Sequence, residues 1–255
     1  MIQKLQDSTQ KYVFIGKSLF FPKEKILVIG DLHLGYDAFL REKSIEIPLK
    51  QFEDVCEELE KITKYITVLY GKIKKIIFLG DIKHHFGFLI TEREEIKKLL
   101  AFLKKFEIDE EQIIFIRGNH EKNEKDKSYR DFYIDGDIAF IHGHKNFPEI
   151  YNKKINLIVM SHIHPSIILR DELKIRAEKY KCFLVGKYKK KKVVIVPSFV
   201  SLIEGALPLE YENTETEREA SFSIIPQKDL EDFGVFVVSE VGEEALKFGK
   251  LKELE

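Results

Sequence analysis

Short apolar runs recur along the first two thirds of the chain, and polar side chains follow each of them. The runs carry Ile, Val, Leu and Phe over four positions without a polar interruption, which is typical of strands buried on both faces of a sheet. They occupy residues 26–29, 76–79, 113–116, 138–141 and 157–160. We therefore expect the polar residues just past these runs to gather along one edge of a sheet, where α/β proteins place their sites.

Between the runs, the spacing of apolar residues changes to three or four, which predicts amphipathic helices. Such spacing covers residues 48–70 and 92–106. Pro48 suits a first helical turn, Gly71 suits a C-terminal cap, and Thr91 begins a capping box.

The last third of the chain returns to strand-like patterns. They lie at residues 182–185, 193–196 and 235–238, whereas the polar and acidic segment within 204–234 predicts a surface loop or a lid. Without an internal repeat or a clear linker, the pattern favours one domain over residues 1–255. The fold class expected from these elements is α/β (α+β), with mixed sheets and helices outside them.

Composition narrows the class of protein. The 255 residues are 44% hydrophobic and 33% charged, as in ordinary globular proteins, and no apolar run approaches the ~20 residues of a membrane span. Without a secretion signal, and with Cys56 and Cys182 expected as reduced thiols, we expect a cytoplasmic protein. A net charge of −1 argues against a protein whose surface is covered in positive charge to bind nucleic acid, and the lysine-rich composition is typical of thermophiles.

Histidines are the strongest chemical signal, because most of them follow the apolar runs. The eight are His33, His84, His85, His120, His142, His144, His162 and His164. In extended backbone, side chains at i and i+2 point to the same side. Asp31 with His33, and His162 with His164, can therefore each reach a single ion.

Three further groups, from Asp81, Asn119 and His142, bring the candidate ligands to seven. Seven groups are too many for one tetrahedral zinc ion, so two ions fit better. Mixed carboxylate, amide and imidazole ligands suit Mn²⁺, our first expectation, or Fe²⁺, Zn²⁺ or Ni²⁺, and disfavour Ca²⁺. Two such ions would activate a bridging water as hydroxide and clamp a phosphate, and His120 is the natural proton donor to the leaving oxygen.

The motifs in this order resemble the calcineurin-like metallophosphoesterases over about residues 25–165. The matching segments are Asp31-Leu32-His33, Gly80-Asp81, Gly118-Asn119-His120-Glu121, His142-Gly143-His144 and His162-Ile163-His164. The resemblance implies a two-layer β-sandwich of mixed sheets flanked by helices. Asp31-Leu32-His33-Leu34-Gly35, Gly80 to His84 and Pro197-Ser198-Phe199 also resemble archaeal SbcD-related phosphoesterases and the bacterial phosphoesterase encoded beside a DNA ligase.

The resemblance also implies a role for each ligand. Asp31, His33 and His164 would bind the first ion, and Asn119, His142 and His162 the second. Asp81 would bridge them, and His120 would be the acid or contact the phosphate. Ser161 and Ser44 stand where the family often has Gly. Ser161 bears on the local backbone, since Gly there allows positive φ.

Other candidates have two readings each. His84 and Asn119 are expected to contact the substrate, with His85 solvated. Arg117 could reach a phosphate, although a salt bridge at the strand end is favoured. His144 either packs in the core or supports a ligand. The basic run of Lys187 and Lys189–Lys192 is typical of a solvated turn, with a nucleic-acid contact as the alternative.

We therefore expect a dinuclear phosphoesterase that cleaves nucleotide or nucleic-acid phosphodiesters in preference to monoesters. One alternative is a DNA exo- or endonuclease subunit with a DNA-repair partner. Against it, only about 90 residues follow His164, and the near-zero charge offers little attraction to duplex DNA. A small diester, such as a 2′,3′-cyclic nucleotide, is at least as well supported. A non-catalytic metal-binding scaffold is the remaining alternative, and the oligomeric state stays open.

Overall fold

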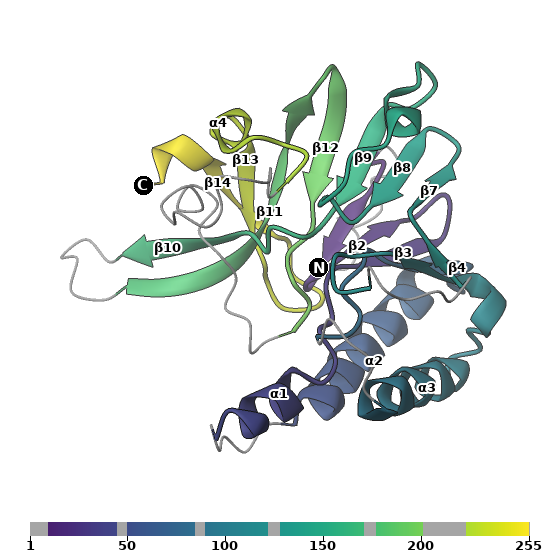
Figure 1. Cartoon of the computed structure of the whole chain (residues 1–255). Coiled ribbons are helices and arrows are strands. Elements are labelled where there is room, and N and C mark those ends of the chain that lie inside the picture. The colour runs from purple at the N-terminus through teal and green to yellow at the C-terminus, as the bar shows by residue number, and fades with distance from the viewer. Residues whose placement is uncertain are drawn as a thin grey trace.

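The fold is a sandwich of two mixed β-sheets with helices outside it (Figure 1). The computed structural model describes residues 10–44, 50–84, 90–121, 128–170, 177–200 and 223–254. In these ranges, the first sheet has six strands and the second has eight. This architecture confirms the predicted two-layer sandwich of mixed sheets.

The first sheet is antiparallel at its N-terminal side and parallel from its third strand onward. Its order is β1-β2-β3-β4-β5-β6. The strands are β1 (Val13–Ile15), β2 (Ser18–Phe21), β3 (Ile26–Ile29), β4 (Lys75–Phe78), β5 (Ile113–Ile116) and β6 (Tyr129–Arg130). Because β3, β4, β5 and β6 run parallel, their carboxyl ends lie at one edge.

The second sheet has the order β14-β13-β11-β12-β9-β8-β7, and β10 pairs with β11. The strands are β7 (Phe132–Asp135), β8 (Ile138–Ile141), β9 (Leu157–Met160), β10 (Ser166–Arg170), β11 (Ala177–Tyr188), β12 (Lys191–Ile195), β13 (Gly234–Val237) and β14 (Leu246–Lys250). Here β8, β9 and β12 run parallel, so their carboxyl ends also share an edge.

Alternating side chains of the apolar runs fill two different layers of the core. In β3, Ile26 and Val28 pack between the sheets, whereas Leu27 and Ile29 pack against the helices. In β8, Phe140 lies between the sheets and Ile141 lies on the outer face of the second sheet. The five predicted runs therefore form β3, β4, β5, β8 and β9, with nearly every residue buried.

Two helices cover the outer side of the first sheet: α2 (Gln51–Tyr70) and α3 (Ile90–Lys104). Helix α1 (Tyr36–Glu42) precedes them, and none of its described side chains belongs to the core on that side. Helix α2 buries a stripe that includes Leu59, Ile62 and Ile66, as its spacing predicts. It ends at Gly71, whose φ of 82° is the left-handed cap conformation that favours glycine. Pro48 and the side chain of Thr91 lie outside the described residues.

Short helical turns and the C-terminal segment cover the outer face of the second sheet. The turns are η3 (Pro148–Tyr151), α4 (Gln227–Leu230) and η5 (Leu251–Glu253), whereas η2 (Glu110–Gln112) precedes β5 of the first sheet. Ile150, Leu230 and Leu251 pack on that face. Of the predicted loop or lid at 204–234, the structure describes residues 223–234, which contain α4. His85 also lies outside the described residues.

The prediction that all the ligand-bearing strands lie along one edge of a single sheet is wrong. Strands β3, β4 and β5 belong to the first sheet, and β8 and β9 to the second. The pattern could not distinguish the two arrangements, because a strand buried on both faces looks the same in either sheet. The site therefore lies where the carboxyl edges of two sheets meet.

Several strands lie outside the predicted set, including β1, β2 and β10. Strand β11 is also longer than the predicted 182–185, because its polar first half pairs with β10. Figure 1 shows β10 and this half of β11 projecting from the sandwich as a two-stranded arm. The exposed first half of β11 lacks the continuous apolar run that marks a buried strand.

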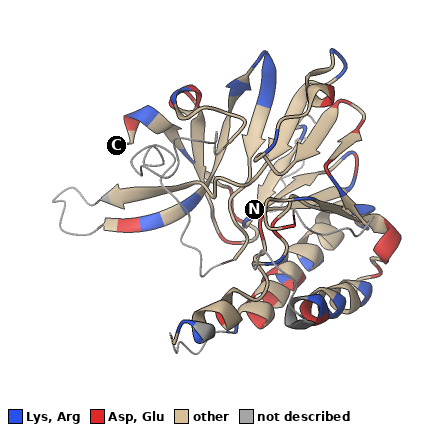
Figure 2. Ribbon diagram, viewed as in Figure 1, with Lys and Arg blue, Asp and Glu red and all other residues tan. Residues whose placement is uncertain are grey.

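Charged residues gather on the helices and turns, whereas the strands between them are largely uncharged (Figure 2). Helices α2 and α3 carry both signs, and α2 includes the ion pairs Glu57–Lys61 and Glu60–Lys64. None of the helices in the described ranges combines the length and apolar character that a membrane span requires.

The packing between the sheets predicts the stability effect of a core substitution. Phe183 of β11 is fully buried and stacks on Phe14 with ring centroids 4.3 Å apart. We expect Phe183→Ala to lower the free energy of unfolding by about 3–5 kcal/mol, measured by urea denaturation. Val68→Ala is the control, since Val68 is 82% exposed. Equal losses in the two variants would contradict this account of the core.

Candidate metal centre

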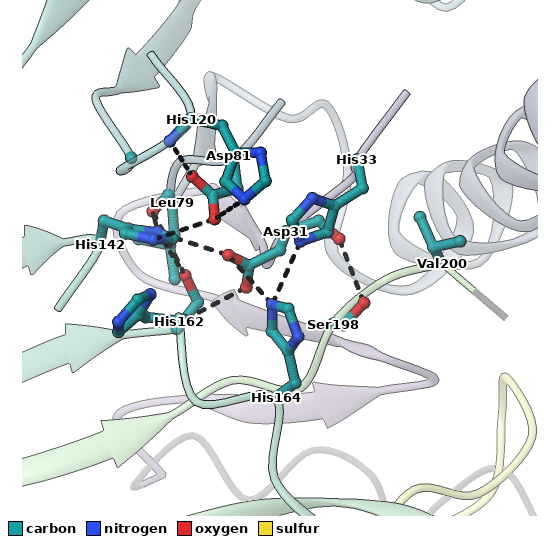
Figure 3. A network of polar contacts seen from close by, with 12 residues as sticks. Asp31, His33, Leu79, Asp81, His120, His142, His162, His164, Ser198 and Val200 are labelled. Carbon is teal, nitrogen blue, oxygen red and sulfur yellow. Dashed lines mark hydrogen bonds and ion pairs between the residues drawn. The ribbon is translucent and has the colours of Figure 1, made fainter. Parts of the chain in front are cut away.

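The first group of candidate ligands joins loops from both sheets. Asp31 and His33 follow β3, and His164 follows β9. Their ligand atoms lie within 4.8 Å of one another. The Nε2 atom of His164 is 3.3 Å from Nε2 of His33 and 3.5 Å from Oδ1 of Asp31 (Figure 3). The structure therefore brings together the three residues that the resemblance assigns to the first ion.

The second group also draws on both sheets. Asp81 follows β4, whereas His142 and His162 follow β8 and β9. Their ligand atoms again lie within 4.8 Å of one another. The Nε2 atom of His142 is 3.4 Å from Oδ2 of Asp81 and 3.0 Å from Oδ1 of Asn119. Asn119 therefore lies beside this group, as its predicted role requires.

Asp31 connects the two groups. Its Oδ1 atom is 3.4 Å from Nδ1 of His142, and its Oδ2 atom accepts a hydrogen bond of 3.3 Å from the backbone N–H of His162. Asp31 is completely buried, and Oδ1 accepts no hydrogen bond from any residue in the described ranges. A buried carboxylate oxygen of this kind fits a cation. The His/Asp clusters are typical of a dinuclear metal site.

The local charge also fits cations. Burial raises the pKa of Asp31, but the imidazoles of His164 and His142 outweigh it and hold that pKa below its usual range. The pKa of Asp81 is likewise lowered, because His142 and His120 outweigh burial. Burial would lower the pKa of His142, yet Asp81 and Asp31 raise it to about 9. The two carboxylates thus stay ionised and attract positive charge.

Four candidate ligands adopt a backbone conformation that L-residues rarely adopt. The φ angles are 44° at His33, 43° at Asp81, 74° at His162 and 43° at His164. Left-handed backbone costs about 1–2 kcal/mol per non-glycine residue, so the surrounding contacts must maintain it. Such strained backbone is typical of functional sites, where the fold holds the side chains in their working orientation before a ligand binds.

Two glycines allow the loops to approach one another this closely. A Cβ atom at Gly118 would lie 2.1 Å from Oδ1 of Asp81, and one at Gly80 would lie 2.5 Å from Nδ1 of His142. The φ of 110° at Gly80 further excludes other residues. The glycines of both motifs are therefore required by the packing around Asp81.

The two serines that differ from the family pattern are accommodated in different ways. Ser44 has a φ of 60°, which explains why relatives often use glycine there. The backbone at Ser161 does not have a positive φ. The strained, left-handed conformation occurs instead at the next residue, His162. The buried Ser161 hydroxyl donates to the carbonyl of Leu79 at 3.2 Å.

His120 lies at the edge of the second group. Its backbone N–H donates to Oδ1 of Asp81 at 3.0 Å, and its Nε2 atom is 3.7 Å from Oδ2 of the same residue. Its Nδ1 atom contacts the carbonyl oxygen of His84, so Nδ1 carries a proton and Nε2 faces the candidate ligands. The His84 ring in turn packs against Tyr36 and Phe39, with centroids 4.6 and 4.8 Å away.

Arg117 makes the salt bridge that the sequence favoured. Its Nε atom lies 3.2 Å from Oδ1 of Asp131, and Nη1 donates to the carbonyl of Glu121 at 3.2 Å. His144 lies beside two candidate ligands, with ring centroids 5.2 Å from His142 and 6.0 Å from His162. The phosphate contact of Arg117 stays a prediction.

Three residues around the centre had no predicted role: Gln51, Glu121 and Lys181. Gln51 begins α2, and Glu121 ends the Gly118-Asn119-His120-Glu121 motif. Burial, together with the negative charge of Asp81, raises the pKa of Glu121 to about 7. Glu121 could have been identified from the motif, whereas nothing in the local pattern distinguishes Gln51 or Lys181 from surface residues.

Comparison with known proteins gives the family. A family model described as calcineurin-like phosphoesterase matches residues 24–202, so the chain belongs to the calcineurin-like phosphoesterases. None of the curated proteins matches the chain.

Among solved structures, the Pseudomonas putida nuclease MPE is 16% identical, with 87% of this chain and 88% of that chain covered and a TM-score of 0.54. A Vps29 double mutant from Entamoeba histolytica is 15% identical, with 88% and 99% covered and a TM-score of 0.38. A predicted phosphoesterase from Streptococcus pneumoniae is 14% identical, with 88% and 97% covered and a TM-score of 0.36. The likeness to the nuclease shows the shared fold.

Lys181 predicts a pH dependence of stability. Its Nζ atom donates to the carbonyl of Ser198 at 2.9 Å and to that of Val200. Burial, together with the ammonium of Lys17, lowers its pKa to about 7. Between pH 7 and the ordinary value of 10.5, the unfolded chain binds a proton that the folded chain lacks. This difference makes the free energy of unfolding rise with pH in that window.

We expect Lys181→Met to remove this rise, so the wild type should gain stability relative to the variant between pH 6.5 and 9.5. Urea denaturation of the metal-free proteins measures the difference. Lys64→Met is the control, because Lys64 is exposed on α2. Parallel pH profiles for wild type and Lys181→Met would show that burial does not perturb this lysine.

Proposed function

We propose that the chain is a dinuclear, metal-dependent phosphodiesterase that hydrolyses nucleotide or nucleic-acid phosphodiester bonds. The observation that carries this proposal is the pair of His/Asp groups joined by Asp31, with His120 beside them. When bound, two divalent ions supply an activated water and positive charge against the phosphate oxygens.

The donors divide between the two ions as the resemblance implies. In our proposal, Asp31, His33 and His164 hold the first ion. Asn119, His142 and His162 hold the second, and Asp81 bridges. Mixed nitrogen and oxygen donors favour Mn²⁺, with Fe²⁺, Zn²⁺ and Ni²⁺ as alternatives.

His120 is proposed as the proton donor to the leaving oxygen. Its Nδ1 proton is held by the carbonyl of His84, so the imidazole presents Nε2 to the candidate ligands. When both ring nitrogens are protonated, the Nε2 proton can move to an alkoxide leaving group and leave the neutral imidazole. Alkyl diesters need this proton more than activated aryl diesters do. His84 and Asn119 are proposed to contact the substrate from either side of His120.

Two observations bear on the substrate. The chain has a net charge of −1, so long duplex DNA has little general attraction to it. The fold is similar to that of a protein named as a nuclease, which makes nucleic acid a necessary part of any substrate test. We propose small diesters and nucleic-acid ends as the substrates, with a nuclease subunit that has a DNA-repair partner as the second candidate.

The proposed ligand and acid roles predict the effects of two substitutions. With Mn²⁺, the wild type should hydrolyse bis(p-nitrophenyl) phosphate, and Asp81→Asn should lower kcat/KM at least about 100-fold by removing a shared ligand. His120→Ala should lower kcat about 10²–10⁴-fold for a diester with an alkyl leaving group. The loss should be smaller for the aryl diester, whose leaving group needs no proton.

Asp137→Asn is the matched carboxylate control, since Asp137 lies on the surface and pairs with Lys11. It should retain wild-type activity. Turnover that persists in a chelator, or an Asp81→Asn variant as active as Asp137→Asn, would overturn the proposal. Metal analysis of the purified chain should give close to two ions, and a chain that contains none would contradict the dinuclear centre. Two bound ions without turnover would instead favour the non-catalytic metal-binding scaffold.

A substrate panel tests the class of diester. It compares an aryl monoester, an aryl diester, 2′,3′-cyclic nucleotides, and single- and double-stranded DNA, all with Mn²⁺. We expect the diesters to exceed the monoester, and cyclic nucleotides or single strands to exceed long duplex. Hydrolysis that is fastest for internal bonds of duplex DNA would instead favour the nuclease-subunit candidate.

A further inference from the structure

Gln51 is a buried amide that holds the loop after β3. It is the first residue of α2 and is only 2% exposed. Its Nε2 atom donates to the carbonyls of Leu32 and His33 at 3.1 and 2.7 Å, and its Oε1 atom accepts from the N–H of Asp37 at 3.3 Å. A carboxamide is the side chain that can donate to two carbonyls and accept from an amide at once.

Glu121 is a buried carboxylate that holds the loops after β4 and β5. It is completely buried. Its Oε1 atom accepts from the N–H groups of Ile82 and Lys83 at 2.9 and 3.3 Å. Its Oε2 atom accepts from those of Asp81 and Gly118 at 3.1 and 2.9 Å. One oxygen atom thus joins the loop that carries Asp81 to the loop that carries Asn119 and His120.

Each of the two side chains binds the backbone of a strained candidate ligand. Gln51 binds the carbonyl of His33, which has a φ of 44°, and Glu121 binds the N–H of Asp81, which has a φ of 43°. Hydrogen bonds at these points offset the cost of left-handed backbone, so their loss would let the loops relax. Within the part of the chain that the structure describes, the hydrogen bonds of Gln51 and those of Glu121 reach different loops.

We propose that Gln51 and Glu121 are positioning residues that separately set the two halves of the metal centre. Gln51 sets the half with Asp31, His33 and His164, and Glu121 sets the half with Asp81, Asn119 and His142. This inference rests on the proposed function, because it presumes that the two groups bind ions. Neither residue is a ligand, and each acts on its ligands through the backbone.

Isosteric substitutions test the two roles. In Glu121→Gln, either orientation of the amide directs an NH₂ group at two backbone N–H donors, so one pair of bonds is lost. In Gln51→Met, the carbonyls of Leu32 and His33 lose their donor. We expect Gln51→Met to weaken one of two Mn²⁺ binding events by about 10–100-fold and to leave the other near its wild-type affinity. Glu121→Gln should weaken that other event by a similar factor and the first event less, because the two ions share Asp81 as a ligand. Titration calorimetry of the metal-free chain measures both events.

Ligand-deleted backgrounds identify which ion is affected. In His33→Ala, which removes a ligand of the first half, Gln51→Met should cause no further loss, whereas Glu121→Gln should weaken the remaining ion. In His162→Ala, which removes a ligand of the second half, Gln51→Met should weaken the remaining ion more than Glu121→Gln does. Equal effects of the two variants on both ions, or no effect of either, would overturn the separation.

Gln112 provides a matched control for Gln51. Its Nε2 atom donates to the carbonyls of Ile73 and Lys74 at 3.4 and 3.0 Å, and its Oε1 atom accepts from the N–H of Asp109 at 3.0 Å, before the start of β5. Gln112→Met therefore removes three hydrogen bonds of the same kind, but it does so far from the carboxyl ends of the parallel strands. It should lower stability as Gln51→Met does and leave both Mn²⁺ affinities unchanged. A loss of Mn²⁺ affinity in Gln112→Met would mean that general destabilisation explains the Gln51 result.

Conservative variants and the wild type complete the test. Glu121→Asp keeps the charge and both acceptor oxygens, so it should recover Mn²⁺ affinity relative to Glu121→Gln. If Glu121→Gln fails to fold, as judged by circular dichroism, the Glu121→Asp and Gln51→Met titrations still decide the inference. A wild type that binds none of Mn²⁺, Fe²⁺, Zn²⁺ and Ni²⁺ would refute the proposed function itself. If the wild type binds two ions and the variants bind them with the same affinities, this inference alone is refuted.

Discussion

The packing of the two sheets against each other is the constraint on which the centre depends. Side chains such as Phe140, Phe183 and Val28 fill the space between the sheets and fix how one sheet lies over the other. That packing sets the carboxyl ends of the parallel strands of both sheets beside one another. Each half of the centre takes ligands from both sheets, so neither sheet alone could hold an ion.

Backbone pairing between loops then fixes the fine geometry. The N–H groups of Leu32 and His33 both donate to the carbonyl of Asp81, at 3.1 and 2.8 Å. The Asp81 loop is therefore bound to the His33 loop directly and to the Asn119 loop through a buried carboxylate. Close packing of this kind explains why glycines are needed at positions 80 and 118, and why strained residues persist between them.

Sequence alone could predict the elements of the fold and the identity of the candidate ligands. Apolar runs at β3, β4, β5, β8 and β9 mark buried strands, and the polar residues after them mark the edge. Sequence could not assign these strands to two sheets, because burial on both faces leaves no sign of the partner sheet. It also could not identify Gln51 or Lys181, whose roles come from partners distant in the chain, such as the carbonyls of His33 and Ser198.

The wide separation of the ligands along the chain has a consequence for biosynthesis. His33 and His164 are 131 residues apart, and both belong to the same group of candidate ligands. A nascent chain on the ribosome therefore lacks this group until β9 of the second sheet and the loop after it have been synthesised, whatever the first sheet has already formed. Contacts of such long range form late in folding. An ion at this site would thus be acquired by the assembled sandwich, and its capture would mark the end of folding instead of starting it.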